Sequence, residues 1–210
     1  MSKMNGVLLA ALLAASVTAN ATVTDVSLNA NVTEVGSTFG QNAGWGNSML
    51  AGANSITSGT FLPMGNQWST NTVFWTSNAD YLQVNLNGSY NISNIALEAD
   101  NNDIYQVSYL HNGTWTTLGD LSPTISGTVN GDGTISQNGA VSWGLGLNGV
   151  DQAITASSFR IQAVGGDNLY GVGQFQAYGT PAPVPEPSSA ALMGVGIAAL
   201  ALLCRRAKAE

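Results

Sequence analysis

The amino-acid sequence predicts an all-β sandwich between two short apolar ends. Between residues 22 and 180, hydrophobic and polar residues alternate in many short runs, and Gly- and Asn-rich turn signals separate these runs. No stretch of useful length in this region has helical periodicity. Short strands joined by such turns are typical of β-sandwiches, so we expect one β domain at residues 22–180.

Residues 1–21 have the build of a secretory signal peptide. A short polar start contains Lys3, an apolar run extends from Gly6 to Ala15, and small residues follow at Ala19 and Ala21. The run is too short to span a bilayer, and its A-x-A ending is the pattern that signal peptidase recognises. We expect cleavage after Ala21. The alternative interpretation is a buried N-terminal helix.

Alternation is clearest in four runs, each of which places one set of side chains on the core face of a sheet. Turn signals at Asn87-Gly88 and at residues 165–167 separate neighbouring runs. The expected inward residues are Leu82, Val84 and Leu86; Ile95, Leu97 and Ala99; Tyr105, Val107 and Tyr109; and Phe159, Ile161 and Ala163.

The clearest hairpin joins Tyr105–Leu110 to Trp115–Leu118. Its connection contains Asn112-Gly113, a dipeptide typical of two-residue hairpin turns. The one histidine of the sequence, His111, lies in this connection, where exposure to solvent is the favoured interpretation. A lone turn histidine forms neither a nucleophile–base pair nor a metal site, so we expect no catalytic residues and no enzymatic activity.

The region from residue 22 to residue 180 is strongly acidic, because Arg160 is its one basic residue against ten acidic ones, a net charge of −9. Nucleic acids and anionic lipid surfaces are bound by clustered Lys and Arg, so neither is an expected partner. A buried guanidinium without a partner is costly. We therefore expect Arg160 to bond a carboxylate, with Asp100, Asp103 and Asp167 as the candidates.

The C-terminal end combines a proline-rich linker, an apolar stretch and a basic tip. The linker, residues 181–189, contains the sequence Val184-Pro185-Glu186-Pro187. The apolar stretch, residues 190–204, would form a helix of about 22 Å, short of the roughly 30 Å hydrocarbon core, so we expect a marginal transmembrane helix. Arg205 and Arg206, in the basic tail 205–210, would stay cytoplasmic and leave the β domain outside.

The order of VPEP, an apolar helix and a terminal RR resembles the PEP-CTERM sorting tail, also called the ice-binding-protein C-terminal domain, over residues 184–210. The resemblance implies processing near Pro185–Pro187 by an exosortase, a membrane-embedded cysteine protease-transpeptidase of Gram-negative envelopes. It implies export across the inner membrane, transient anchoring through the C-terminal helix, and delivery to the cell surface or extracellular matrix. The alternative is a permanent one-helix anchor.

Most of the region between the two ends resembles the discoidin-like, galactose-binding-like domains. The segments that carry the resemblance are GWGNSMLAG, GTFLPMGNQWSTNTVFW, YLQVNLNGSYNISNIALEADNND and SFRIQAVGGDNLYGVGQFQAYG. The resemblance implies an eight-stranded jelly-roll sandwich. Residues 119–158, rich in Gly, Ser, Asn and Thr, fit this pattern least well and are expected to form long loops or an added edge.

Trp45 and Trp143 are the candidate residues for the rim of a ligand site. Both lie in Gly-rich loops, and indole rings stack on pyranose faces. For each of them, packing against the fold is the competing interpretation. Trp75, before a strand, and Trp115, within the hairpin, are expected in the core.

Asp100 and Asp103, in the sequence EADNND, are the candidate ligands of a calcium ion, which prefers oxygen donors. A turn between two strands is the favoured alternative, because Asp and Asn cap backbone amides there. The resemblance also implies a structural calcium site elsewhere, but its matching positions, Ala51-Gly52 and Gln174, have no carboxylate. Apart from calcium, no cofactor is expected.

These observations predict an exported carbohydrate- or exopolysaccharide-binding or adhesion module, whose partners are signal peptidase, an exosortase and an extracellular polysaccharide. A purely structural surface or biofilm protein without a small ligand is the alternative. An ice-binding surface is disfavoured, because it would need regular threonine arrays and the threonines here are scattered.

Both ends of the chain are predicted to be processed. Protein recovered from the cells that make it should begin at Thr22 and end close to Pro185–Pro187, with any added lipid or sugar visible as extra mass. Intact-mass measurement and terminal sequencing test both cleavages. A cytosolic product that still begins at Met1 and ends at Glu210 would contradict the predicted route.

Overall fold

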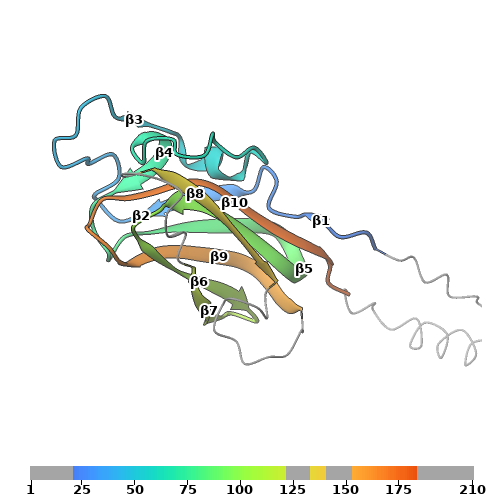
Figure 1. Ribbon diagram of the computed structural model, residues 1–210. Helices are drawn as coiled ribbons and strands as arrows, with labels where there is room; N and C mark the ends of the chain where they lie inside the picture. Colours follow the sequence, from blue (N-terminus) through green and yellow to red (C-terminus); the bar gives the residue numbers. More distant parts are fainter. Residues whose placement is uncertain (1–20, 122–132, 141–152, 184–210) are drawn as a thin grey trace, which may run out of the picture.

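The computed structural model describes residues 21–121, 133–140 and 153–183, which form a curled, mainly antiparallel β-sheet (Figure 1). One 3-10 helix, η1 (Ala53–Thr57), occurs among these residues. The strands are β1 (Thr24–Asp25), β2 (Asn31–Val35), β3 (Met49–Leu50), β4 (Thr70–Trp75), β5 (Tyr81–Asp100), β6 (Ile104–His111), β7 (Thr114–Leu121), β8 (Thr134–Ala140), β9 (Ile154–Gly165) and β10 (Tyr170–Pro181).

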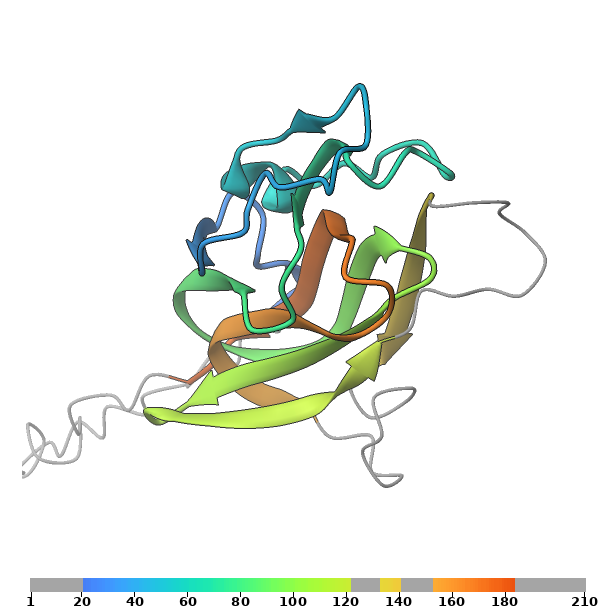
Figure 2. The same cartoon turned by 90° about the vertical axis from the view of Figure 1, so that its left-hand side faces the viewer.

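The sheet curls into two layers that share β5. The first part of β5 pairs with β2 and β9, and the layer continues through β6 to β7. The second part of β5 pairs with β8 and β10, and this layer continues through β4 to β3. In the turned view of Figure 2, β3 and η1, in the segment drawn in cyan, lie on the same side of the other strands.

The predicted turn at Asn87-Gly88 is wrong, because β5 continues through it as a single strand of 20 residues. The pairing with β9 shifts register between Asn85 and Tyr90, which marks an irregularity in the strand. Such bulges bend a strand and increase its twist without reversing it. Asn87 and Gly88 therefore lie where β5 bends, between its pairs with β2 and its pairs with β10 and β8.

The predicted hairpin is confirmed. β6 and β7 pair antiparallel with Leu110 opposite Trp115, and the chain reverses at Asn112 and Gly113. These two residues have φ values of 48° and 78°, the left-handed conformations that a two-residue hairpin turn requires. His111, the last residue of β6, is exposed beside the turn.

The core lies between the two layers and contains most of the residues predicted to face inward. Leu86 and Tyr109 are only partly buried, while the other ten expected inward residues are buried. Trp75 also lies in the core as predicted, with its ring centroid 6.2 Å from that of Tyr105 and 5.9 Å from that of Tyr170. At the end of β5, Ala96, Glu98 and Asp100 are buried as well, so both faces of this strand end are covered.

The two ends of the described chain lie side by side. β1 pairs with the end of β10, with Thr24 opposite Gly179 and Asp25 opposite Tyr178 (Figure 1). No helix in residues 21–121, 133–140 and 153–183 has the length and apolar character needed to cross a bilayer. The predicted signal peptide, except Ala21, and the predicted span 190–204 lie outside these residues, as do Ala19, Trp143, Val184, Pro185, Glu186, Pro187, Arg205 and Arg206.

Tyr105 should be a strong contributor to stability. Its hydroxyl accepts a hydrogen bond from the Gly171 amide at 3.0 Å and lies 3.1 Å from the Gly171 carbonyl, inside the core. Burial, together with Asp103 and Asp100, raises the pKa of Tyr105 well above its usual value, so the neutral form persists. Tyr105→Phe should lower the free energy of unfolding by about 1–3 kcal/mol, because the buried Gly171 amide loses its acceptor.

Urea denaturation measures this change. Tyr109→Phe, on the same strand but only half-buried, is the matched control and should change stability by less than about 0.5 kcal/mol. Equal effects of the two substitutions would contradict the role assigned to the Tyr105 hydroxyl.

Candidate functional site

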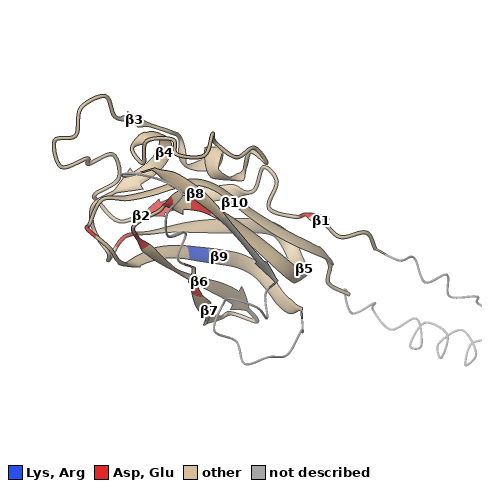
Figure 3. Ribbon diagram, viewed as in Figure 1, with Lys and Arg blue, Asp and Glu red and all other residues tan. Residues whose placement is uncertain are grey.

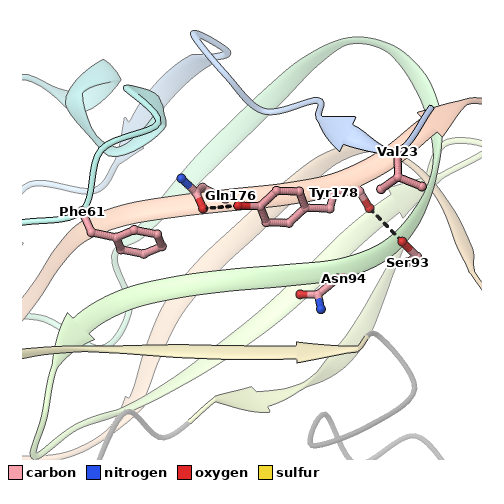
Figure 4. A pocket seen from close by; sticks show the side chains of 6 residues that line it. All are labelled: Val23, Phe61, Ser93, Asn94, Gln176 and Tyr178. Carbon is pink, nitrogen blue, oxygen red and sulfur yellow. Dashed lines mark hydrogen bonds between the residues drawn. The ribbon is translucent and has the colours of Figure 1, made fainter.

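An open groove with a volume of about 390 Å³ runs along β10 on the outside of the sandwich (Figure 4). In Figure 4, the Phe61 and Tyr178 rings lie at two places along β10 with Gln176 between them, and Asn94 and Ser93 lie on the neighbouring strand β5. Val23 comes from the segment before β1. The six lining residues are Val23, Phe61, Ser93, Asn94, Gln176 and Tyr178.

The alternation of β10 places the groove residues outside. Phe175 and Ala177 have no exposed surface and pack in the core, so the residues that alternate with them, Gln176 and Tyr178, face the other side of the sheet. Asn94 stands opposite Tyr178 in the antiparallel pairing of β5 and β10. Strand register therefore sets the positions of the Gln176 and Asn94 amides and of the Tyr178 ring.

Hydrogen bonds fix the polar groups of the groove. The Tyr178 hydroxyl donates to Gln176 Oε1 at 2.6 Å, and Gln176 Nε2 donates to the Gly59 carbonyl at 3.1 Å. The Ser93 hydroxyl donates to the Tyr178 carbonyl at 3.3 Å. Gln176 is buried, with 5% of its surface exposed, so these bonds hold its amide at the base of the groove.

Glu98 holds the loop that presents Phe61. The Leu62 amide donates to Glu98 Oε2 at 2.9 Å, and the Thr134 hydroxyl donates to Glu98 Oε1 at 3.2 Å. The side chain is fully buried, and burial raises the pKa of Glu98 above its ordinary value, opposed by these two hydrogen bonds. A Cβ atom at position 173 would lie 2.9 Å from Glu98 Oε2, so a larger residue there would displace the carboxylate.

A second hollow, with a volume of about 470 Å³, lies on the other side of Phe61. Both hollows include Phe61, so they meet at this ring and follow β10 from Gly173 to Tyr178. An elongated ligand would therefore find more than one place to bind along the strand. The residues that line the second hollow are Ala51, Ser55, Ser58, Thr60, Phe61, Leu62, Pro63, Asn71 and Gly173.

The groove offers aromatic faces, amides and hydroxyls, and none of its six lining residues carries a charge. Aromatic rings provide flat apolar surfaces for the C–H faces of a ligand, and amides bond its hydroxyls. This combination suits a neutral polyhydroxyl ligand. The carboxylate nearest to the Phe61 loop, that of Glu98, is occupied by the Leu62 and Thr134 hydrogen bonds described above.

Trp45 lies outside both hollows. It is 45% exposed in a loop, and its ring meets the edge of the buried Trp68 ring at a centroid distance of 6.5 Å. Its role at a ligand rim stays a prediction, as does that of Trp143, which lies outside the described residues. Alternation around Phe175 could have indicated Gln176 and Tyr178, whereas Phe61 lies in a loop without periodicity and gave no such signal.

Asp100 and Asp103 are both buried at the turn between β5 and β6. Asp103 Oδ1 accepts from the Asp167 amide and Asp103 Oδ2 from the Tyr105 hydroxyl, each at 3.3 Å. Gly166 permits this packing, because a Cβ atom there would lie 1.6 Å from Asp103 Oδ1. Within the described residues, no three His, Cys, Asp or Glu side chains are grouped to hold a metal ion, and the calcium assignment remains a prediction.

The predicted carboxylate partner of Arg160 is wrong. Its guanidinium lies over the rings of Trp115 and Tyr81, and its Nε donates to Gln83 Oε1 at 3.4 Å. Two aromatic faces and an amide oxygen replace the expected carboxylate, since a weakly hydrated guanidinium stacks well on π-systems. The predicted core position of Trp115 is also wrong, because this ring is only half-buried.

A family model for the PEP-CTERM protein-sorting motif matches residues 183–206. The chain therefore carries this sorting signal, which marks an exported protein of Gram-negative bacteria with a C-terminal sorting tail at the membrane. The predicted recognition of the tail is confirmed. No curated protein matches the chain in a sequence comparison.

Solved structures share the fold of the β region. A fucolectin from Morone saxatilis (striped bass) serum has a TM-score of 0.54 at 13% identity, over 79% of this chain and 52% of that chain. A family 89 glycoside hydrolase of Clostridium perfringens has a TM-score of 0.50 at 14% identity, over 77% of this chain and 15% of that one.

The family 32 CBM of C. perfringens NanJ, solved with galactose, has a TM-score of 0.48 at 15% identity, over 75% of this chain and 99% of that chain. The fucolectin likeness carries the assignment of the fold, and the predicted all-β, galactose-binding-like fold is confirmed.

Stability should depend on pH through Glu98. Because its pKa in the folded protein is raised above the ordinary value of 4.5, the folded state retains a proton that the unfolded state has already released. The protonated Glu98 side chain therefore stabilises the folded state fully below pH 4.5. This stabilisation is lost as the pH rises through the raised pKa. Glu98→Gln removes this titration.

Denaturant unfolding of both proteins between pH 4 and pH 7 measures the effect. The stability of the Gln variant, relative to the natural protein, should improve as the pH rises. Parallel stability curves for the two proteins would contradict the raised pKa of Glu98.

Proposed function

We propose that this protein is an exported, exosortase-sorted surface or matrix protein that binds carbohydrate, such as an exopolysaccharide, without catalysing a reaction. The groove along β10 carries the proposal, because it combines two aromatic rings with the Gln176 amide, which two hydrogen bonds hold in a fixed orientation. Its volume of about 390 Å³ lies in the range of sites that hold small organic ligands.

The sorting motif supports the proposed route. Signal peptidase would remove residues 1–21, and the β unit at residues 22–180 would reach the outside. The apolar stretch 190–204 and the basic tail 205–210, with Arg205 and Arg206, would hold the chain at the membrane. The exosortase would then act near Pro185–Pro187.

The contacts of the groove support binding rather than catalysis. Acid–base or nucleophilic chemistry needs an ionisable or nucleophilic group placed beside a base. The Ser93 hydroxyl in the groove donates to a backbone carbonyl, and the Glu98 carboxylate behind the loop holds a backbone amide and a hydroxyl. The fucolectin that shares the fold is, by its name, a sugar-binding protein.

The groove predicts which residues a glycan contacts. On a glycan array, Phe61→Ala and Tyr178→Ala should each weaken binding of the recognised glycan by about 10-fold or more, because a lost aromatic face costs about 1.5 kcal/mol or more. Trp45→Ala, at an exposed tryptophan outside the groove, tests the alternative rim position, and a site in the groove predicts that this variant binds like the natural protein.

Loss of binding in Trp45→Ala, with no effect of the groove variants, would move the site to the Trp45 loop and contradict the groove. If no neutral or acidic glycan on the array binds, carbohydrate binding is refuted and a purely structural surface or biofilm protein is the function that remains.

A further inference from the structure

A second group of polar and aromatic side chains lies on the outside of the other layer, around Arg160. Phe159 and Ile161 are buried, so Arg160 between them points away from the core. Gln83 of β5 and Ser108 of β6 stand directly opposite Arg160 on the two neighbouring strands. Arg160 is the one Lys or Arg of the described residues, the single blue segment in Figure 3.

Two rings clamp the guanidinium. The Arg160 Cζ atom lies 3.8 Å from the centroid of the Trp115 ring and 4.7 Å from that of the Tyr81 ring. Both distances are well inside the range of cation–π attraction. An arginine held between two aromatic faces loses little further conformational freedom when its N–H groups bind a ligand.

The two aromatic rings lie against the guanidinium, and most of its N–H donors have no protein acceptor among the described residues. Arg160 has five N–H donors, and its hydrogen bond to a protein acceptor is the 3.4 Å contact from Nε to Gln83 Oε1. No carboxylate is among its partners in the described residues. Arg160 is half-buried, so part of its side chain is accessible to a ligand from solvent.

Amide side chains surround the clamp on the same face. Gln162 follows Arg160 at the next outward position of β9, and Gln106 of β6 stands opposite Gln162. Gln83 Nε2 donates to Asn85 Oδ1 at 2.8 Å, and Gln162 Nε2 donates to the Asn78 carbonyl at 2.7 Å, which fixes both amides. Gln106 donates to the exposed Asp120 at 3.3 Å.

We propose that this surface, the Arg160 clamp (Tyr81, Gln83, Trp115, Arg160 and Gln162), binds the carboxylate of an acidic sugar, a uronic acid within a largely neutral glycan. The planar fork of a guanidinium matches a carboxylate in two parallel hydrogen bonds. The surrounding amides suit the hydroxyls of the same sugar. This site is separate from the groove along β10, and it takes a ligand of different charge.

Charge limits the ligand to few carboxylates. The region from residue 22 to residue 180 has a net charge of −9, which repels a densely charged polyanion or an acidic protein surface. A single carboxylate within a neutral glycan meets the local positive charge of Arg160 with little of this repulsion. The clamp therefore selects one acidic sugar and disfavours a polyanion.

Isothermal titration of the purified full-length protein tests the proposal with two probes. They are a xylotriose that bears one glucuronic acid and a hyaluronan tetrasaccharide, each compared with its carboxyl-reduced form. The natural protein should bind at least the first probe about 10- to 100-fold more tightly than its reduced form, the range expected for hydrogen bonds to a charged group.

Arg160→Gln should abolish this preference. Arg160→Lys, which retains the charge without the fork, should recover only part of it. Thermal unfolding establishes that each variant is folded, and the Lys variant provides the test if the Gln variant does not fold. Phe61→Ala, in the loop that lines the groove along β10, should retain the preference in full.

Absence of any preference for the acidic probes, or an equal preference in the natural protein and Arg160→Gln, would overturn the proposal. Loss of the preference in Phe61→Ala would refute a site separate from the groove. The two proposals fail independently, because neutral glycans on the array report on the groove and the acid-versus-reduced comparison reports on Arg160.

Discussion

The whole fold depends on one constraint, the membership of β5 in both layers of the sandwich. A strand of 20 residues can serve two layers only if it bends, and the register shift between Asn85 and Tyr90 provides the bend. On one side of the shift β5 pairs with β2, on the other side it pairs with β8 and β10, and β9 pairs with it on both sides. If the bend were lost, one of the two layers would lose its central strand.

The same strand takes part in both candidate binding surfaces. Its second half contributes Ser93 and Asn94 to the groove, and its first half contributes Tyr81 and Gln83 to the Arg160 clamp. Gln176 and Tyr178 in the groove and Gln83 and Arg160 in the clamp alternate with buried residues, so the packing of the core sets the spacing of these outer side chains. Because the two surfaces lie on different layers, one chain could bind two parts of a polymer at once.

Alternation and turn residues were sufficient to predict the sandwich and the β6–β7 hairpin, because both depend on local sequence. They failed at Asn87-Gly88, where pairing on both sides continues the strand through residues that usually end one. The prediction of a carboxylate partner for Arg160 failed for a related reason. Its true neighbours, Tyr81 and Trp115, come from different strands, and only the register of the folded sheet brings them together.

The position of the chain ends relates the two surfaces to the sorting signal. Tyr178 of the groove pairs with Asp25, and β10 ends at Pro181, one residue short of the motif that begins at residue 183. A chain attached through its C-terminal end would hold the groove next to the point of attachment. Arg160 lies on β9 of the other layer, six residues beyond the start of that strand. Attachment would thus place the groove near the surface that anchors the protein, and the Arg160 clamp would bind polymer farther from that surface.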